Sequence, residues 1–217
     1  MRLPLREQVF EMLLDDILKG SFNAGEKLKD TEIAKRLGIS RTPAREALIR
    51  LEEEGYLVNN MGRGFEIVSI GEREVVEIYL LVAELEFFAL NQIKEIDDKI
   101  LNNLIKINNK LTSMKLNPIE KMNLDIKWHE IIVSLGNNET LKKTIKSFKK
   151  KTVWFELNYM KTEDTSTISA EDHTLIIDML KKSNFPEAAK LLKKNCLRTA
   201  ELIRNTKRGE DNEQSFK

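Results

Sequence analysis

The sequence predicts a mostly α-helical chain with two domains: a small N-terminal domain that includes a β-hairpin, and a larger all-helical domain. Three observations support this fold class. Apolar residues recur at helical spacing through most of the 217 residues. Two strand-like segments around a glycine-containing turn occur between residues 55 and 68. After residue 71 there is no strand signal, and the only prolines, Pro118 and Pro186, fit helix starts.

Composition and charge limit the classes of protein that fit. A chain of 217 residues can form two modest domains that bury their cores without disulfides or metals. The net charge of +1 argues against a polycation that coats nucleic acid, but it allows a local basic patch. The single cysteine, Cys196, cannot form an internal disulfide, so we expect a packed thiol without a redox role.

The sequence shows no secretion or membrane signal. No N-terminal stretch combines the charged, apolar and small-residue parts of a signal peptide, and no apolar run approaches the length of a membrane span. We therefore expect a cytoplasmic protein with no membrane partner.

The N-terminal domain, residues 1–70, begins with a supporting helix over Leu5–Lys19 and a loop to residue 25. The segment Thr31–Gly55 then predicts a helix, a glycine turn at Gly38 and a second helix with Ser40 as its N-cap. This is the pattern of a helix-turn-helix. Two short amphipathic helices around a glycine also occur in folds that bind no nucleic acid, so the pattern alone leaves both interpretations open.

The start of the second helix carries the side chains that favour a DNA-binding interpretation. A helix-turn-helix places the N-terminal residues of its second helix at the base edges of the major groove. Here those residues are Ser40, Arg41, Thr42 and Arg45, which can bind phosphate or guanine. Between Lys27 and Arg50 seven basic residues face three acidic ones, a local net charge of +4. We include Arg50 among the candidate DNA contacts because it belongs to this patch.

The strand-like segments after this helix predict a wing. Residues 55–58 and 65–68 have strand character, and the turn between them contains Gly62, Arg63 and Gly64. The N-terminal domain is thus predicted to be a winged helix-turn-helix with Arg63 at the tip of the wing.

The string SRTPAREAL, followed by LEEEGYLV, resembles the DNA-binding domain of GntR-type bacterial transcription regulators. The resemblance covers nearly all of the first 70 residues. It implies that Arg41 and Arg45 make the principal base and phosphate contacts, that Thr42 contacts a phosphate, and that Gly62–Gly64 lies near the minor groove. Family members often have proline where Ala24 stands, and this difference should affect only the stiffness of the loop.

The second domain, residues 71–205, is predicted to be a helical bundle that follows a connector too short to act as a flexible tether. The helices are expected near residues 72–94, 96–113, 118–135, 138–160, 167–182 and 186–205. The first is apolar on more than one face, so it must be covered on more than one side, by its own bundle or by a second subunit. Residues 206–217 are polar and aperiodic, and we expect a disordered tail.

Both histidines of the chain fall on inward-facing positions of this bundle. Asp125 and His129 lie one helical turn apart, and His173 shares a face with Ile176 and Leu180. A carboxylate and two imidazoles inside a bundle can bind a divalent metal. The alternative for each histidine alone is a hydrogen-bonded core residue.

The strings LDIKWHEII and EDHTLIIDML resemble the metal-carrying motifs of the FCD effector domain, the helical partner in the FadR branch of the GntR family. The resemblance implies a site made by Asp125, His129, His173 and a third histidine on the last helix. Asn195 stands at that last position, and its amide oxygen is a poor ligand for zinc and nickel but acceptable to harder ions. Val82 stands where many relatives have an arginine that grips a carboxylate. Both differences weaken the expectation of an organic-acid effector bound through a metal.

These observations predict a sequence-specific DNA-binding regulator and not an enzyme. We expect a homodimer on a short palindromic operator in double-stranded DNA, controlled by a small ligand or by a divalent metal such as zinc, nickel or manganese. In one alternative the helical domain is only a dimerisation scaffold. In a second, the chain is a metal-dependent enzyme with a DNA-binding appendage, but it has no nucleophile and base pair and no phosphate-cradling glycine loop.

Overall fold

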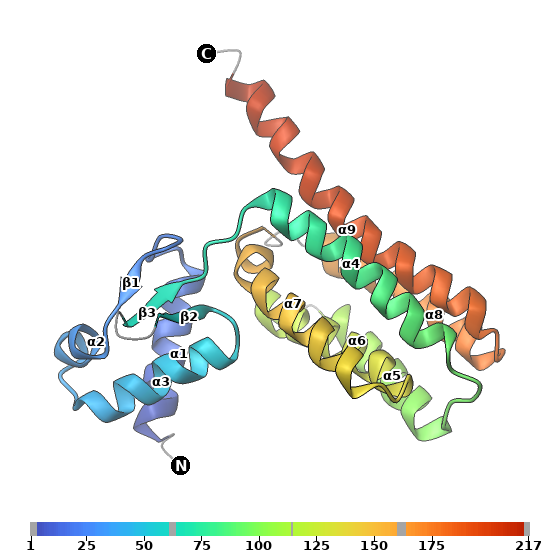
Figure 1. The fold of residues 1–217 in the computed structure, drawn as a ribbon, viewed down its shortest axis with the longest axis horizontal. Helices are drawn as coiled ribbons and strands as arrows, with labels where there is room; N and C mark the ends of the chain where they lie inside the picture. The colour runs from blue at the N-terminus through green and yellow to red at the C-terminus, as the bar shows by residue number, and fades with distance from the viewer. Residues whose placement is uncertain (1–3, 61–63, 114, 160–163, 215–217) are drawn as a thin grey trace. The chain divides into compact units, whose positions relative to one another are not determined.

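A computed structural model of the chain describes residues 4–60, 64–113, 115–159 and 164–214 (Figure 1). The chain divides into two compact units. The first comprises Met1–Gly71 and Lys150–Asn158, and the second comprises Glu72–Lys149 and Tyr159–Lys217. Among the described residues, none of the helices has the length and apolar character needed to cross a bilayer.

The first unit contains the predicted helix-turn-helix. Its helices are α1 (Leu5–Leu18), α2 (Asp30–Leu37) and α3 (Arg41–Glu53), and α1 packs against α3. Gly38 ends α2 with a φ of 64°, in the left-handed region where only glycine is unstrained. The amide of Ile39 then donates to the carbonyl of Ala34, which closes the turn before α3 begins. The expected supporting role of the first helix and the glycine turn are both confirmed.

A three-stranded antiparallel sheet completes this unit. Its strands are β1 (Lys27–Leu28), β2 (Leu57–Asn60) and β3 (Gly64–Ile67), in the order β1-β3-β2. In the hairpin Val58 lies opposite Glu66. The two predicted strands are confirmed, although the first begins at Leu57 and not at residue 55. Strand β1 has no signal in the sequence, because a two-residue strand is too short to show an alternating pattern.

The described residues of the second unit form helices and the short connections between them, with no strand. Its elements are α4 (Glu72–Asn91), α5 (Asp98–Leu111), α6 (Pro118–Leu135), α8 (Asp164–Lys181), α9 (Phe185–Gln214) and the first half of α7 (Glu139–Tyr159), since Lys150–Asn158 belong to the first unit. The predicted helices are all present, with ends that differ by a few residues. The exception is α9, which continues to Gln214, past the end near residue 205 that the sequence indicated. Residues 205–214 contain no proline, and their single glycine is not enough to end the helix.

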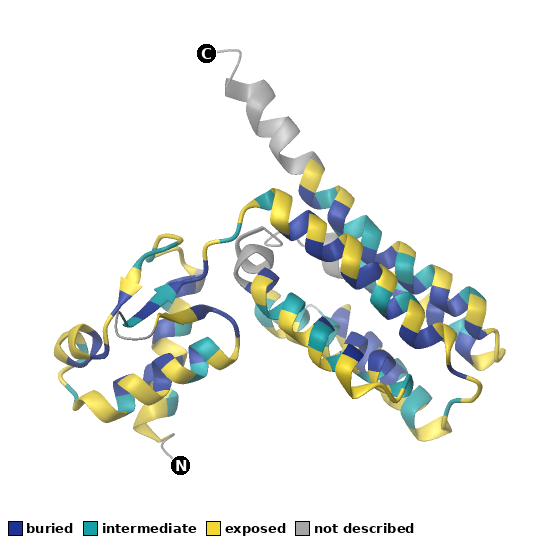
Figure 2. Ribbon diagram, in the orientation of Figure 1, coloured by how far each residue is buried: buried dark blue, intermediate teal, exposed yellow. Residues whose placement is uncertain are grey.

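Long-range packing brings the polar residues of the bundle together. The helices α4 and α9 lie side by side, α8 packs on α9, and α5 packs on α6 and α8 (Figure 1). Buried and exposed residues alternate along the helices, as expected for amphipathic segments (Figure 2). The core includes Trp128, Ile132, Ile176 and Leu192, and Glu86, His129 and His173 are buried near it. Buried polar groups need partners, so the neighbours of these three residues mark a candidate site in the bundle.

Candidate nucleic-acid interface and metal centre

The first turn of α3 presents the predicted DNA contacts on the surface. Ser40 occupies the N-cap position in an extended conformation, but its hydroxyl makes no capping hydrogen bond, so capping by that side chain, which the sequence predicted, is wrong. The side chains of Arg41 and Arg45 are 67% and 59% exposed. Thr42 is exposed as well. Ser40, Arg41, Thr42 and Arg45 therefore form one accessible polar surface.

Asp30, at the start of α2, lies beside the two arginines. Nη2 of Arg41 donates to both Asp30 oxygens, at 3.3 and 3.2 Å, and Nη1 of Arg45 donates to Oδ2 at 3.4 Å. Burial disfavours ionisation of Asp30, but Arg41 and Arg45 lower the pKa of its carboxyl below its ordinary value. A hollow of about 260 Å³ opens here, lined by Asp30, Arg41, Thr42, Arg45, Glu46 and Ile49. The sequence gives no sign that Asp30 contacts the two arginines, because the contact joins α2 to α3.

Arg50 lies near the other end of α3, and its described contacts are with residues of the same unit. Its guanidinium pairs with Glu7 and, through Nε at 3.0 Å, with Glu54. Its Cζ lies 3.8 Å from the centroid of the Phe10 ring. These contacts link α1 to α3, and a contact of Arg50 with DNA stays a prediction.

Part of the predicted wing lies outside the described residues. This applies to Gly62 and Arg63, whose proposed contacts stay predictions. Gly64 begins β3 with a φ of 90°, and a Cβ added there would lie 3.2 Å from the Leu28 carbonyl oxygen. A glycine is therefore required where the wing returns next to β1.

In the bundle, Asp125, His129 and His173 converge as predicted. The Nε2 atoms of His129 and His173 are 3.4 Å apart, and they lie 3.9 and 3.6 Å from oxygens of Asp125. The hydroxyl of Ser169 donates to Asp125 Oδ1. Trp128 stacks on His173, with ring centroids 3.7 Å apart, and fixes the plane of that imidazole. Three ligand atoms from α6 and α8 thus face one another.

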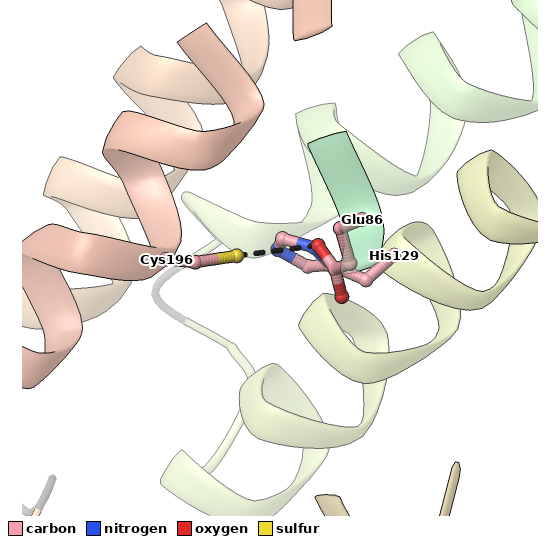
Figure 3. A group of neighbouring side chains, drawn as sticks. All are labelled: Glu86, His129 and Cys196. Atoms are coloured by element: carbon pink, nitrogen blue, oxygen red, sulfur yellow. Dashed lines mark hydrogen bonds and ion pairs between the residues drawn. The ribbon is translucent and has the colours of Figure 1, made fainter. Parts of the chain in front are cut away.

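A second, unpredicted group surrounds the other side of His129 (Figure 3). Oε2 of the fully buried Glu86 on α4 lies 2.6 Å from Nδ1 of His129 and 3.2 Å from Sγ of Cys196 on α9. Nζ of Lys149 lies 2.9 Å from the other carboxylate oxygen. A carboxylate only accepts hydrogen bonds, so Nδ1 of His129 donates to Glu86, and Nε2 is the ring nitrogen that faces His173.

The charges of this network are set by burial and by pairing. Burial alone would raise the pKa of Glu86, but His129 and Lys149 hold it well below its ordinary value. Burial likewise opposes charge on Lys149, whose pKa is nevertheless raised by Glu86. Burial lowers the pKa of His173 to about 3 and raises that of Cys196 well above its ordinary value. Cys196 is therefore a protonated, packed thiol, in agreement with its predicted role.

The residues present fit a divalent cation between Asp125, His129 and His173. Two ligands that share a tetrahedral zinc ion at about 2.0–2.1 Å are about 3.4 Å apart, close to the observed separations. The carboxylates of Asp125 and Glu86 and the ammonium of Lys149 give the surroundings a net negative charge before the imidazoles are counted. The facing Nε2 atoms also need a proton or a cation between them, because two lone pairs at 3.4 Å repel.

The predicted fourth ligand has a different neighbour. The amide nitrogen of Asn195 donates to Oδ2 of Asp172 at 3.3 Å, and Arg198 pairs with the same oxygen. The next residue, Cys196, is the one that reaches the Glu86 and His129 pair. Val82, where the family resemblance leads us to expect an arginine, is a buried apolar residue. A ligand role for Asn195 stays a prediction.

Comparison with known proteins decides the family. Residues 5–67 match the family described as bacterial regulatory proteins, gntR family, and residues 77–197 match the FCD domain. An HTH-type transcriptional regulator of Bacillus subtilis, YdhC, is 33% identical over 192 residues, which cover 86% of this chain and 85% of the relative. The chain belongs to the GntR family.

Other relatives of this GntR-family regulator are also named as regulators. The Uxu operon regulator of Haemophilus influenzae is 25% identical over 85% of this chain and 76% of its own length. Among solved structures, a putative GntR regulator from Rhodococcus sp. RHA1 has a TM-score of 0.70 at 20% identity, covering 93% of this chain and 98% of that one. That likeness concerns the fold. The family assignment identifies a DNA-binding transcriptional regulator with an FCD domain, and not an enzyme.

Proposed function

We propose that this GntR-family regulator binds a short inverted repeat in double-stranded DNA as a homodimer, and that a divalent metal or a small ligand in the helical domain controls binding. The observation that carries the proposal is the pair of exposed guanidiniums of Arg41 and Arg45 at the start of α3. Arginine at the N-terminus of a recognition helix can read guanine O6 and N7. We expect the protein to act in the cytoplasm, where it meets the DNA.

The surface of α4 supports the homodimer. Three large apolar side chains on this helix are exposed, Leu80 at 38%, Leu81 at 52% and Phe88 at 49%. Leu81 and Phe88 are seven residues apart and therefore lie on the same face. An apolar face of this kind on a bundle is a candidate subunit interface. Two-fold symmetry in the dimer would require a symmetric operator.

The cluster of Asp125, His129 and His173 supports control by a divalent metal. A bound ion would supply a positive charge that bridges α6 and α8. Glu86 would hold His129 with Nε2 toward the ion, in the manner of a carboxylate–histidine–metal triad. Such a ligand changes DNA binding only if it prefers one arrangement of the two winged helices over another.

A regulator whose bundle is only a scaffold is the second candidate. Two observations favour it over an organic-acid sensor. Val82, where the family resemblance leads us to expect a carboxylate-binding arginine, is buried and apolar, and the ammonium of Lys149 is paired with Glu86. This candidate predicts DNA affinity that does not respond to chelators or metabolite extracts.

Selection of bound duplexes from a random DNA pool, with and without added zinc, nickel or manganese, tests the proposal. We expect an enriched inverted repeat whose recovery depends on metal. An enriched repeat that is indifferent to metal would support the scaffold candidate. An unenriched pool under every condition would contradict sequence-specific recognition.

Calorimetry on chelator-treated protein tests the metal part directly. We expect binding heat with at least one of the three ions, and a much weaker response in His173→Ala. Heats equal to dilution for all three ions would remove the metal from the proposal.

A further inference from the structure

Among the described residues, Asp30 is the only acidic residue that forms ion pairs with Arg41 and Arg45, the two proposed DNA-reading arginines. Its side chain is 11% exposed, whereas those of Arg41 and Arg45 are 67% and 59% exposed. The carboxylate therefore lies below the surface, and the guanidiniums extend over it toward solvent. A duplex that reaches this surface meets the arginines first.

The contacts to Asp30 are long enough to be exchanged. The donor–acceptor distances are 3.2 to 3.4 Å, longer than the roughly 2.7–2.9 Å of a strong charge-assisted hydrogen bond. Asp30 uses one terminal nitrogen of each guanidinium, which leaves the other nitrogens for an outside acceptor. The arginines are restrained but still able to bind.

The position of Asp30 also reduces the electrostatic repulsion between the two arginines on α3. Arg41 and Arg45 are four residues apart on one helix face, where like charges repel. The carboxylate of Asp30 lies between them and offsets that repulsion, because its Oδ2 contacts both. Without it, the two side chains would spread toward any nearby phosphate.

We propose that Asp30 is a positioning residue that sets the specificity of DNA recognition. It holds the two guanidiniums together and competes with phosphates for them, so that weak, sequence-independent contacts are penalised. A guanine edge in the right register offers two acceptors in fixed geometry and overcomes this competition. Asp30 thus lowers affinity for random DNA more than affinity for the operator. The inference rests on the proposed sequence-specific recognition.

The test compares Asp30→Asn with wild type for binding to the selected operator and to a scrambled duplex over a salt series. We expect affinity for scrambled DNA to rise about threefold or more, affinity for the operator to rise less, and the operator preference to fall. The salt dependence on scrambled DNA should steepen by about 0.9 in the log–log slope, as for one more phosphate contact.

Glu32→Gln is the matched control. It makes the same charge change on the same helix, but Glu32 pairs with Lys29 and not with the arginines. We expect it to leave the operator preference unchanged. Asp30→Glu restores the charge next to the guanidiniums and should recover most of the preference, which separates this role from a purely structural one. Thermal melting of each variant checks that α2 remains folded.

Each outcome decides a specific claim. If wild type prefers the operator and Asp30→Asn keeps the same preference, the proposed role of Asp30 is contradicted. The proposed function is not affected by that result. A Glu32→Gln variant that loses preference equally shows a general charge effect and also overturns it. A wild-type protein with no operator preference contradicts the proposed function itself.

Discussion

At the scale of single residues, the helical domain depends on a carboxylate that the sequence pattern hides. Glu86 is fully buried and contacts His129, Lys149 and Cys196. It stands in a nearly continuous apolar run of α4, and a charged residue between apolar neighbours is the sequence signal that points to it. Lys149 belongs to a run of three lysines that is typical of a solvated face, so its contact with the buried Glu86 could not be predicted.

Replacement of Glu86 by alanine should strongly destabilise the protein. The change removes the fully buried carboxylate that pairs with His129 and Lys149, and loss of one partner of a buried ion pair costs about 3–5 kcal/mol in the free energy of unfolding. Urea denaturation measures this directly. Glu84→Ala is the control on the same helix, because Glu84 is 61% exposed and pairs with Lys193 at the surface. Equal effects of the two substitutions would show that the Glu86 pair has no special role.

The burial of His173 predicts a pH dependence of stability. In the unfolded chain this histidine takes up a proton near pH 6.5, whereas in the folded chain its pKa is about 3. Acidification through this window therefore favours the unfolded state, and chelator-treated protein should lose about 2 kcal/mol of stability between pH 7 and pH 5. His173→Asn should lose much less over the same range. Identical pH profiles for the two proteins would refute this assignment.

At the scale of elements, the sequence predicts helices well wherever a local signal marks their ends. Asn117 and Glu120 form a capping box at the start of α6, and that start was predicted at the correct residue. The end of α9 carries no such signal and was placed too early. The two-residue β1 is defined only by its pairing with β3, a long-range contact that periodicity cannot show.

In the candidate sites too, spacing along one helix predicts contacts within that helix but not contacts between helices. Helical spacing predicts that Asp125 and His129 share a face, because they are one turn apart. The approach of His173 to them depends on how α6 and α8 pack, which the sequence indicated through resemblance to the FCD motifs. The contact of Asp30 with Arg41 and Arg45 crosses from α2 to α3 and had no sequence signal.

The turn between α2 and α3 should be sensitive to substitution of its glycine. Gly38→Ala places a Cβ at a φ of 64°, and although nothing lies within 4 Å of that position, the backbone strain costs about 1 kcal/mol. Gly38→Asn should cost less. Gly71→Ala provides a control, since its φ lies outside the left-handed region and its surroundings are open. Chemical denaturation that found Gly38→Ala and Gly71→Ala equally stable would contradict the strained turn.

At the scale of the whole molecule, the proposed recognition of an inverted repeat requires a dimer of the chain. A charge placed in the exposed apolar face of α4, as in Leu81→Glu, should shift the protein from dimer to monomer in sedimentation experiments. Operator affinity should fall with it, because each winged helix would then bind a half-site alone. Glu77→Gln is a conservative control on an exposed position of the same helix. A variant that dimerises as tightly as wild type would move the interface elsewhere.

The central claim is that Arg41 and Arg45 read DNA from the start of α3. The most direct measurement compares wild type, Arg41→Ala and Arg45→Ala for binding to the selected operator and to scrambled duplex under the same salt conditions. A guanine contact by either arginine predicts a loss of about 1–3 kcal/mol on the operator and a flattened sequence preference. If both variants distinguish the operator from scrambled DNA as well as wild type does, this account of recognition is contradicted.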